Sequence, residues 1–214
     1  MFARIMLILS VLTALAVSPA RGAELRSASF IPHWLPQAQF AGYYMAQEKG
    51  LYKKQGIDLK ILRGGPEYPP SETIARGKVT FASTFLTSAL ELRSRGVRLV
   101  NIGQLVQRSG FILVTKKASG INSPADLNGK KVGIWNAFRL QPEAFFRKYG
   151  IEVKPVEQGA TMNLFLRDGV VAASAMWYNE YHTLLNAGLN EEDLKLFFFD
   201  QHGLNFPEDG IYCL

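Results

Sequence analysis

From residue 24 onward, short apolar runs alternate with segments of helical spacing, and Gly or Asn stands at most of the joints. Such alternation is typical of α/β proteins in which helices connect parallel strands. The apolar runs predict strands at 25–31, 57–62, 79–82, 97–106, 111–115, 131–135, 152–156, 172–176 and 195–199. The helical spacing predicts helices at 39–49, 70–76, 84–94, 142–148, 161–167 and 178–187.

Two segments repeat the same order of helix end, Gly and strand: residues 54–60 (KQGIDLK) match residues 148–154 (KYGIEVK) in type. Two lobes built on one βαβ plan would explain the repeat, although such joints are common in any α/β protein. We expect a first lobe at 24–115, a second lobe at 116–209 and the start of a return to the first lobe at 210–214. The Gly-, Asn-, Ser- and Pro-rich stretch 119–130 is the expected boundary. Because residues 210–214 begin an apolar run and then stop, we expect that a C-terminal portion is missing.

The N-terminus has the composition of a secretory signal peptide. A short segment with Arg4 precedes the unbroken apolar run 5–17, which is too short to span a membrane. Small residues permit cleavage after Ala20 or after Ala23, and both sites stay open; a buried core helix is the alternative interpretation. We therefore expect residues 1–23 to be a signal peptide and the mature protein to be periplasmic. No cysteine lies near the cleavage sites, so a lipid anchor is not expected.

The composition is that of an ordinary globular protein, with 48% hydrophobic and 20% charged residues. A chain this apolar is not intrinsically disordered. Cys213 is the single cysteine, which excludes a disulfide framework within the chain. The formal net charge of +6 is spread without a basic block, so we expect no nucleic-acid partner.

The loop after the first predicted strand is the first candidate for a binding site. Prolines bracket His33 and Trp34, and the helix that follows places Gln39 and Tyr43 on one face. In open α/β sheets, ligands bind at the carboxyl ends of strands and beside helix N-termini. We therefore predict that these four side chains contact a ligand.

A second candidate group directly follows the predicted strand 172–176. Tyr178, Asn179 and Glu180 combine an aromatic ring, an amide and a carboxylate, which suits a flat molecule that forms hydrogen bonds. Glu180 would also favour the N-terminus of the following helix without any ligand. We predict that the three residues bind ligand, because they are clustered at a strand end.

Four further residues occupy similar positions. Ser83 and Thr84 follow the strand at 79–82, where their commonest role is to cap the next helix. Trp135 and Asn136 close the strand at 131–135 and are expected to line the far wall of a cleft.

Residue patterns that carry catalysis are missing from the sequence. The three histidines lack zinc-site spacing, and Arg63-Gly64-Gly65-Pro66 lacks the lysine of a phosphate-binding loop. No nucleophile elbow is present. We therefore expect a binding protein without catalytic residues, metal or cofactor, and not an enzyme.

The block WLPQAQFAGYY at 34–44, followed by EKGLYKKQGIDL at 48–59, resembles periplasmic solute-binding proteins for thiamine pyrimidine precursors and alkanesulfonates. The segments DLNGKKVG at 126–133 and WYNEY at 177–181 extend the resemblance, and the second is similar to the pyrimidine-binding branch. The resemblance implies the two-lobed periplasmic-binding-protein fold (type II), with a mostly parallel mixed sheet in each lobe and crossings near Thr115 and Gly210. It also implies a monomer that holds a small molecule at the hinge and passes it to an inner-membrane ABC permease. Tyr178 would stack on a pyrimidine, Glu180 would hydrogen-bond to it, and Trp34 would lie opposite; riboflavin-like or sulfonate ligands are alternatives.

The same superfamily contains an enzyme, the thiamine pyrimidine synthase of fungi. In that enzyme a lysine after the Gly-Lys-Val strand holds pyridoxal phosphate, and a histidine one helical turn later is consumed as substrate. The corresponding positions in this chain are Thr84 and Ser88. The amine that would form the imine and the imidazole that would be consumed are therefore both missing, and the synthase is kept only as the alternative function.

Overall fold

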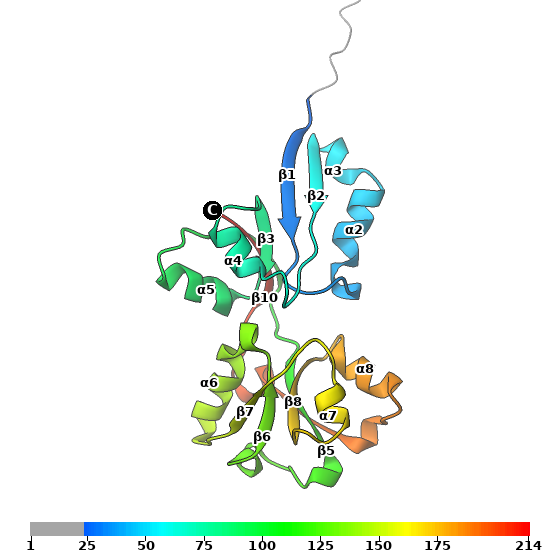
Figure 1. The fold of residues 1–214 in the computed structure, drawn as a ribbon, viewed down its shortest axis with the longest axis vertical. Coiled ribbons are helices and arrows are strands. Elements are labelled where there is room, and N and C mark those ends of the chain that lie inside the picture. Colours follow the sequence, from blue (N-terminus) through cyan, green and yellow to red (C-terminus); the bar gives the residue numbers. More distant parts are fainter. Residues whose placement is uncertain (1–23) are drawn as a thin grey trace, which may run out of the picture.

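The structure, a computed structural model, describes residues 24–214 and contains two five-stranded sheets flanked by helices. The sheets form two lobes, one above the other in Figure 1. The predicted signal peptide at 1–23 lies outside the described residues. The α/β class and the two-lobed arrangement are confirmed. Each sheet is mixed rather than mostly parallel, because its parallel pairings are matched by antiparallel ones.

The first lobe is built on the sheet β2-β1-β3-β10-β4. Its strands are β1 (Arg26–Ile31), β2 (Ile57–Ile61), β3 (Phe81–Thr84), β4 (Val100–Val106) and β10 (Glu208–Cys213). Its helices are α2 (Ala41–Glu48), α3 (Leu51–Lys54), α4 (Pro70–Ala75) and α5 (Leu86–Ser94). The predicted helix at 39–49 ends at Gly50, whose left-handed φ of 64° separates α2 from α3.

The second lobe is built on the sheet β7-β6-β8-β5-β9. Its strands are β5 (Phe111–Lys116), β6 (Lys131–Ile134), β7 (Lys154–Glu157), β8 (Ala172–Met176) and β9 (Leu194–Phe198). Its helices are α6 (Leu140–Tyr149), α7 (Asn163–Leu166) and α8 (Glu180–Asn186). Short 3-10 helices η3 (Pro124–Leu127), η4 (Asn136–Phe138) and η6 (Asp200–His202) complete the connections used below.

The chain crosses between the lobes at residues 107–110 and returns where β10 begins. The crossing expected near residue 115 falls inside β5, which pairs with β8 and β9 in the second sheet. The stretch 119–130, expected as the boundary, lies within the second lobe and contains η3, whose Leu127 is fully buried. Gly, Asn and Pro here mark a capped turn inside a lobe, since these residues favour any turn and not only a linker.

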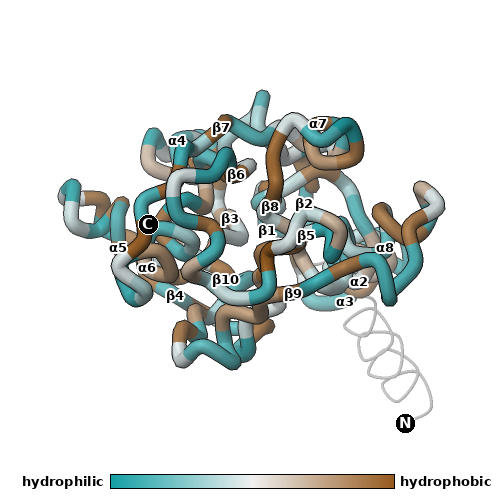
Figure 2. Tube along the Cα trace, turned by 90° about the horizontal axis from the view of Figure 1, so that it is seen from below, coloured by the Kyte–Doolittle hydropathy of each residue, from teal (hydrophilic) through white to brown (hydrophobic). Residues whose placement is uncertain are grey.

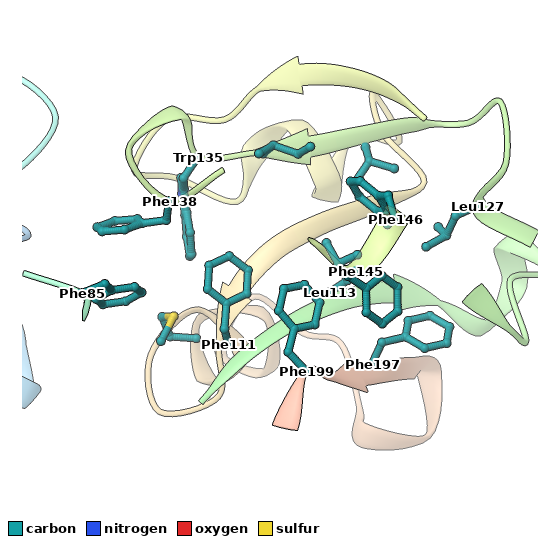
Figure 3. Packing of buried hydrophobic residues seen from close by; sticks show 14 of the residues in the cluster. Phe85, Phe111, Leu113, Leu127, Trp135, Phe138, Phe145, Phe146, Phe197 and Phe199 are labelled. Atoms are coloured by element: carbon teal, nitrogen blue, oxygen red, sulfur yellow. The ribbon is translucent and has the colours of Figure 1, made fainter. Parts of the chain in front are cut away.

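One apolar cluster extends from the second lobe into the first. Phe111, Phe145 and Phe199 stack in its centre, with ring centroids 5.0 Å apart for Phe111 and Phe199 and 4.9 Å apart for Phe145 and Phe199. Phe85 of the first lobe faces Phe138 of the second at the edge of this cluster (Figure 3). The lobes are therefore joined by packed rings as well as by the two chain connections.

Each lobe also has an apolar cluster of its own. In the first lobe, residues such as Ile74 and Leu99 pack around Tyr212 of β10. In the second lobe, Ile112 and Leu184 belong to a cluster on the other face of the sheet. Apolar and hydrophilic stretches alternate along the whole trace in Figure 2. Within residues 24–214, no helix has the length and apolar character needed to cross a membrane.

Candidate functional site

The carboxyl ends of three strands meet between the lobes and line a cleft of about 440 Å³. β1 leads to His33 and Trp34, β3 ends at Thr84, and β6 leads to Trp135 and Asn136. Parallel strands end at the same edge of a sheet, so side chains far apart in sequence converge here. The remaining residues that line the cleft are Gly65, Pro66, Pro69, Pro70, Ser71, Glu72, Ser88, Glu91, Arg95, Ala137, Phe138, Arg139, Glu157 and Gln158.

Aromatic rings from both lobes form the floor of this cleft. The ring centroids of Trp34 and Trp135 are 5.7 Å apart, and Phe138 lies 5.7 Å from Trp34. Phe85 stacks on Phe138 with centroids 4.4 Å apart. The Trp135 indole N–H donates to the Gly159 carbonyl at 3.0 Å, which fixes the orientation of its ring. Trp34 and Trp135 are buried to 6% and 3% exposure, so the floor is held in place by packing across the lobes.

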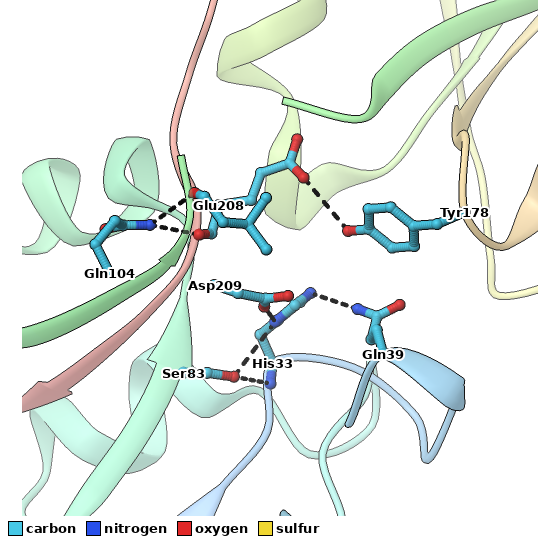
Figure 4. Close-up of polar contacts among 8 residues, drawn as sticks. His33, Gln39, Ser83, Gln104, Tyr178, Glu208 and Asp209 are labelled. Atoms are coloured by element: carbon cyan, nitrogen blue, oxygen red, sulfur yellow. Dashed lines mark hydrogen bonds and ion pairs between the residues drawn. The ribbon is translucent and has the colours of Figure 1, made fainter. Parts of the chain in front are cut away.

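His33 contacts Phe85 and Phe138 edge-on, and polar groups hold it from three sides (Figure 4). Its backbone N–H donates to Ser83 Oγ at 2.9 Å, and its Nδ1 lies 2.6 Å from Asp209 Oδ1. Gln39 Nε2 lies 3.4 Å from His33 Nε2. Ser83 is fully buried, so it positions His33 and does not face the cleft.

Glu180 reaches a small inner cavity beside the cleft, together with His33, Trp34, Gln39 and Trp135. Its Oε2 accepts the Met176 N–H at 2.9 Å, and its Oε1 accepts from the Asn179 side chain at 2.6 Å. Burial raises the pKa of the Glu180 carboxyl. Asn179 thus orients Glu180 and lies outside the linings of the cleft and the cavity.

Tyr178 points to the chain connection between the lobes and is absent from the cleft lining. Its hydroxyl donates to Glu208 Oε2 at 3.3 Å, and a side chain at Gly110 would collide with its ring. Burial raises the pKa of Tyr178, and the nearby Glu208 carboxylate raises it further. Tyr43 is also turned away: its ring packs 4.5 Å from Phe30, and burial raises its pKa.

The structure differs from the predicted arrangement of the residues opposite Trp34. We expected Tyr178, Asn179 and Glu180 to lie opposite Trp34, whereas the rings of Trp135 and Phe138 lie there. The direction of the loop after β8 explains the difference, because the loop turns Tyr178 toward the first residues of β10. Glu180 alone of the three reaches a cavity in the described part of the chain.

Sequence reasoning missed several residues of the site. Gln158 directly follows β7, so the strand-end rule applied to every strand would have found it. Phe138 lies at the end of η4, beyond the end of β6, where this rule gives no signal. Glu208 and Asp209 gave no such signal, because they begin their strand and do not follow its carboxyl end.

Polar contacts between α5 and the start of α6 bridge the lobes beside the cleft. Gln141 Nε2 donates to Thr87 Oγ1 at 2.8 Å, and Arg139 Nη2 lies 3.0 Å from Glu91 Oε1. Ser88 Oγ donates to the Ala137 carbonyl at 3.3 Å. These contacts hold the two lobes against each other at one side of the cleft.

Comparison with known proteins identifies the family. The sequence profile described as NMT1/THI5 like matches residues 37–213. The chain belongs to the NMT1/THI5-like family. The 4-amino-5-hydroxymethyl-2-methylpyrimidine phosphate synthase of Schizosaccharomyces pombe is 29% identical over 126 residues, which are 58% of this chain and 36% of that protein. The match thus spans about a third of the length of this curated relative.

Solved structures share the fold of this NMT1/THI5-like protein. The periplasmic aliphatic sulphonate binding protein SsuA of Escherichia coli superposes with a TM-score of 0.67 at 17% identity, covering 88% of this chain and 65% of SsuA. An ABC uptake transporter substrate binding protein of Streptococcus pneumoniae, with bound histidine, gives a TM-score of 0.58 at 17% identity and covers 87% and 79%. These likenesses establish the periplasmic-binding-protein fold.

The comparisons correct one expectation. We expected that the chain is not an enzyme, and this prediction is contradicted by several curated relatives that are named as synthases at about 28% identity. The absence of zinc-site spacing, a phosphate-binding loop and a nucleophile elbow is weak evidence against enzymatic activity, because a cofactor can supply the chemistry without any of these patterns.

Proposed function

We propose that this protein is a periplasmic solute-binding component of an ABC importer and that it holds a small heteroaromatic molecule in the cleft between its lobes. The cleft of about 440 Å³, floored by the paired rings of Trp34 and Trp135, is the observation that carries the proposal. Its volume suits a small ligand, for which pockets of about 300 to 1,000 Å³ are usual. The names of the structural neighbours support the same class of function.

The cleft lining favours a flat, polar ligand. Trp34 and Trp135 pack on each other in this structure, so a ligand ring would stack on them once the lobes open. Each aromatic pair then contributes about 0.5 to 1.5 kcal/mol beyond area burial. Asn136 is exposed at the cleft and offers both a donor and an acceptor, whereas the amide of Gln158 is occupied by the Ser174 backbone. The hydroxyl group of Thr84 adds a further polar contact.

A thiamine pyrimidine precursor is the preferred ligand, with riboflavin-like and sulfonate ligands as alternatives. The Glu180 carboxyl lines an inner cavity of only about 10 Å³, so it would accept an N–H from the amino group of a pyrimidine once this cavity opens into the cleft. A sulfonate needs cationic partners: Arg139 at the cleft is paired with Glu91, which leaves Arg95 as the cleft arginine that makes no ion pair among the described residues. The site residues identified from the sequence that line the cleft or its inner cavity are His33, Trp34, Gln39, Thr84, Trp135, Asn136 and Glu180.

This proposal gives the protein specific partners. The exported monomer would deliver its ligand to an inner-membrane ABC permease, and nucleic acid has no part in the process. Lobe closure would exclude water from the ligand and strengthen its hydrogen bonds.

Thermal-shift screening tests the ligand class. The wild-type protein is heated with pyrimidines, flavins and alkanesulfonates in turn; a ligand at about 100 times its dissociation constant adds about 2.7 kcal/mol of stability. Asn136→Ala should reduce the shift, whereas Asn186→Ala, an exposed position on α8, should leave it unchanged. A shift with sulfonates but not with pyrimidines would overturn the preferred ligand. A full shift in Asn136→Ala would overturn the proposed role of this amide.

The synthase is a second candidate, favoured by the names of the curated relatives. The cleft does not fit pyridoxal phosphate as an imine: Thr84 and Ser88 carry hydroxyls, and no lysine is among the described residues that line the cleft. Absorbance spectra of the protein mixed with pyridoxal phosphate test this candidate. An imine band that resists dialysis would favour the synthase.

A further inference from the structure

Two adjacent buried carboxyl groups stand where the chain re-enters the first lobe. Glu208 and Asp209 open β10 and have 0% and 6% of their surface exposed. They contact opposite lobes (Figure 4): Asp209 Oδ1 lies 2.6 Å from His33 Nδ1 in the first lobe, and Glu208 Oε2 accepts from Tyr178 in the second. Rotation of one lobe against the other must change at least one of these contacts.

Glu208 also joins the two chain connections to each other. Ser109, on the outgoing connection, donates from Oγ to Glu208 Oε1 at 2.5 Å. The backbone carbonyl of Glu208 accepts from the Gln104 side chain of β4. Asp209, the next residue, has a left-handed φ of 50°, which is uncommon for any residue except Gly. Ser109 and Gln104 therefore fix Glu208 to the outgoing connection and to the first lobe, and the contact with Tyr178 links it to the second lobe.

The surroundings of Glu208 disfavour its charged form. The pKa of the Glu208 carboxyl is raised to about 7. Burial is the largest cause and the neighbouring Asp209 carboxylate adds to it, while the hydrogen bonds from Ser109, the Gly110 N–H and Tyr178 act in the opposite direction. The other titratable groups that face this joint are Tyr178, Glu180 and His33. None of the described contacts pairs the Glu208 side chain with a cation.

We propose that Glu208 is a proton-linked hinge residue: a protonated carboxyl favours the closed lobes, and ionisation favours opening. The inference rests on the proposed function, because closure has a biological consequence only if the cleft holds a ligand. It states how that site would be regulated, with closure strengthened in an acidic medium and weakened at neutral or alkaline pH.

The direction of the pH dependence follows from the difference in the pKa of Glu208 between the closed and the open form. In an open form, water reaches Glu208 and its pKa returns toward the ordinary value of 4.5, whereas the closed form holds it near 7. The closed form therefore binds the proton more tightly. The ratio of closed to open protein should fall as pH rises from about 4.5 through 7 and stay constant above, by about tenfold or more between pH 5 and pH 8.

Scattering and fluorescence of the ligand-free protein test this hinge. The radius of gyration by small-angle X-ray scattering should increase between pH 5 and pH 8. Tryptophan emission should shift to longer wavelength, because Trp34 and Trp135 bury each other only while the lobes are closed. Far-UV circular dichroism at each pH verifies that the chain stays folded.

Two variants identify the responsible group. Glu208→Gln should remove the pH dependence. Tyr178→Phe should move its midpoint to higher pH, because the tyrosine hydroxyl donates to the ionised carboxylate and so lowers the pKa of Glu208. If Glu208→Gln does not fold, the midpoint of the pH dependence in Tyr178→Phe tests the proposal by itself.

Three results would overturn the hinge proposal: a wild-type protein unaffected by pH, a transition that survives Glu208→Gln, or an unmoved midpoint in Tyr178→Phe. A transition removed by His33→Gln but not by Glu208→Gln would assign it to the pair with Asp209 instead. The measurements need no ligand, so failure of the ligand screen and failure of the hinge are separate results.

Discussion

Single glycines determine how closely the loops beside the cleft approach each other. A Cβ atom added at Gly64 would lie 1.8 Å from the Pro32 carbonyl oxygen, so the loop before α4 could not stay against the loop after β1. Gly64→Ala should lower the free energy of unfolding by about 1 to 3 kcal/mol, the usual range for overpacking. Gly42→Ala is the matched control, because nothing lies within 4 Å of its added Cβ and alanine favours the helix α2 by about 1 kcal/mol. Urea denaturation distinguishes the two, and equal stabilities would contradict the loop contact.

The buried Glu180 carboxyl should make stability depend on pH. Burial raises its pKa above the ordinary 4.5 in the folded chain, and unfolding restores that value. The folded state therefore binds the proton more tightly, and the free energy of unfolding should fall as pH rises from 4.5 through the raised pKa. Glu180→Gln should reduce this slope in denaturation measured from pH 4.5 to pH 8, whereas Glu192→Gln, at an exposed position, should not. An unchanged slope in Glu180→Gln would show that other groups carry it.

At the scale of elements, α5 and the start of α6 form a polar bridge between lobes that is testable by a double-mutant cycle. Arg139 and Glu91 are partly exposed, at 39% and 30%, so their coupling should be about 0.2 to 1 kcal/mol and should weaken in high salt. The cycle combines Arg139→Gln, Glu91→Gln and the double variant in thermal unfolding. The ion pair of Arg76 and Glu72 within α4 is the control, since it is exposed and joins no lobes. A cross-lobe coupling of zero would remove this pair from the bridge.

The strands could be predicted from the sequence more fully than the site. Buried strands such as Phe111–Lys116 and Ala172–Met176 consist mostly of apolar residues, and this hydrophobic pattern identifies them. Trp34 and Trp135 were placed at the cleft because each follows a strand. Tyr178 follows a strand too, but its direction depends on a contact with Glu208, thirty residues away. No local pattern encodes such a contact. For the same reason, the sequence did not identify the buried pair Glu208 and Asp209 as residues of the site.

At the scale of the whole molecule, the rings between the lobes should make unfolding cooperative. The first lobe has a separate small apolar cluster around Ile74, whereas the largest cluster belongs to the second lobe and includes Phe85 and Trp34 of the first. The first lobe therefore depends on the second for much of its apolar burial. We expect both lobes to unfold in one transition. If one lobe unfolded first, the other would lose the apolar contacts between them and would be destabilised as well.

Phe138 and Phe145 allow this cooperativity to be tested with two truncations of equal chemistry. Phe138 stacks on Phe85 across the lobes, and Phe145 packs on Phe199 within the second lobe. Either change to alanine should cost about 3 to 5 kcal/mol. In calorimetry, Phe138→Ala should split the unfolding into two transitions, with the first lobe melting earlier, because its contact with the second lobe is lost. Phe145→Ala should lower the melting temperature and leave a single transition, because the contacts between the lobes remain. A single transition in Phe138→Ala would mean that the remaining contacts between the lobes, among them Trp34 on Trp135 and the pair of Arg139 and Glu91, still couple the lobes.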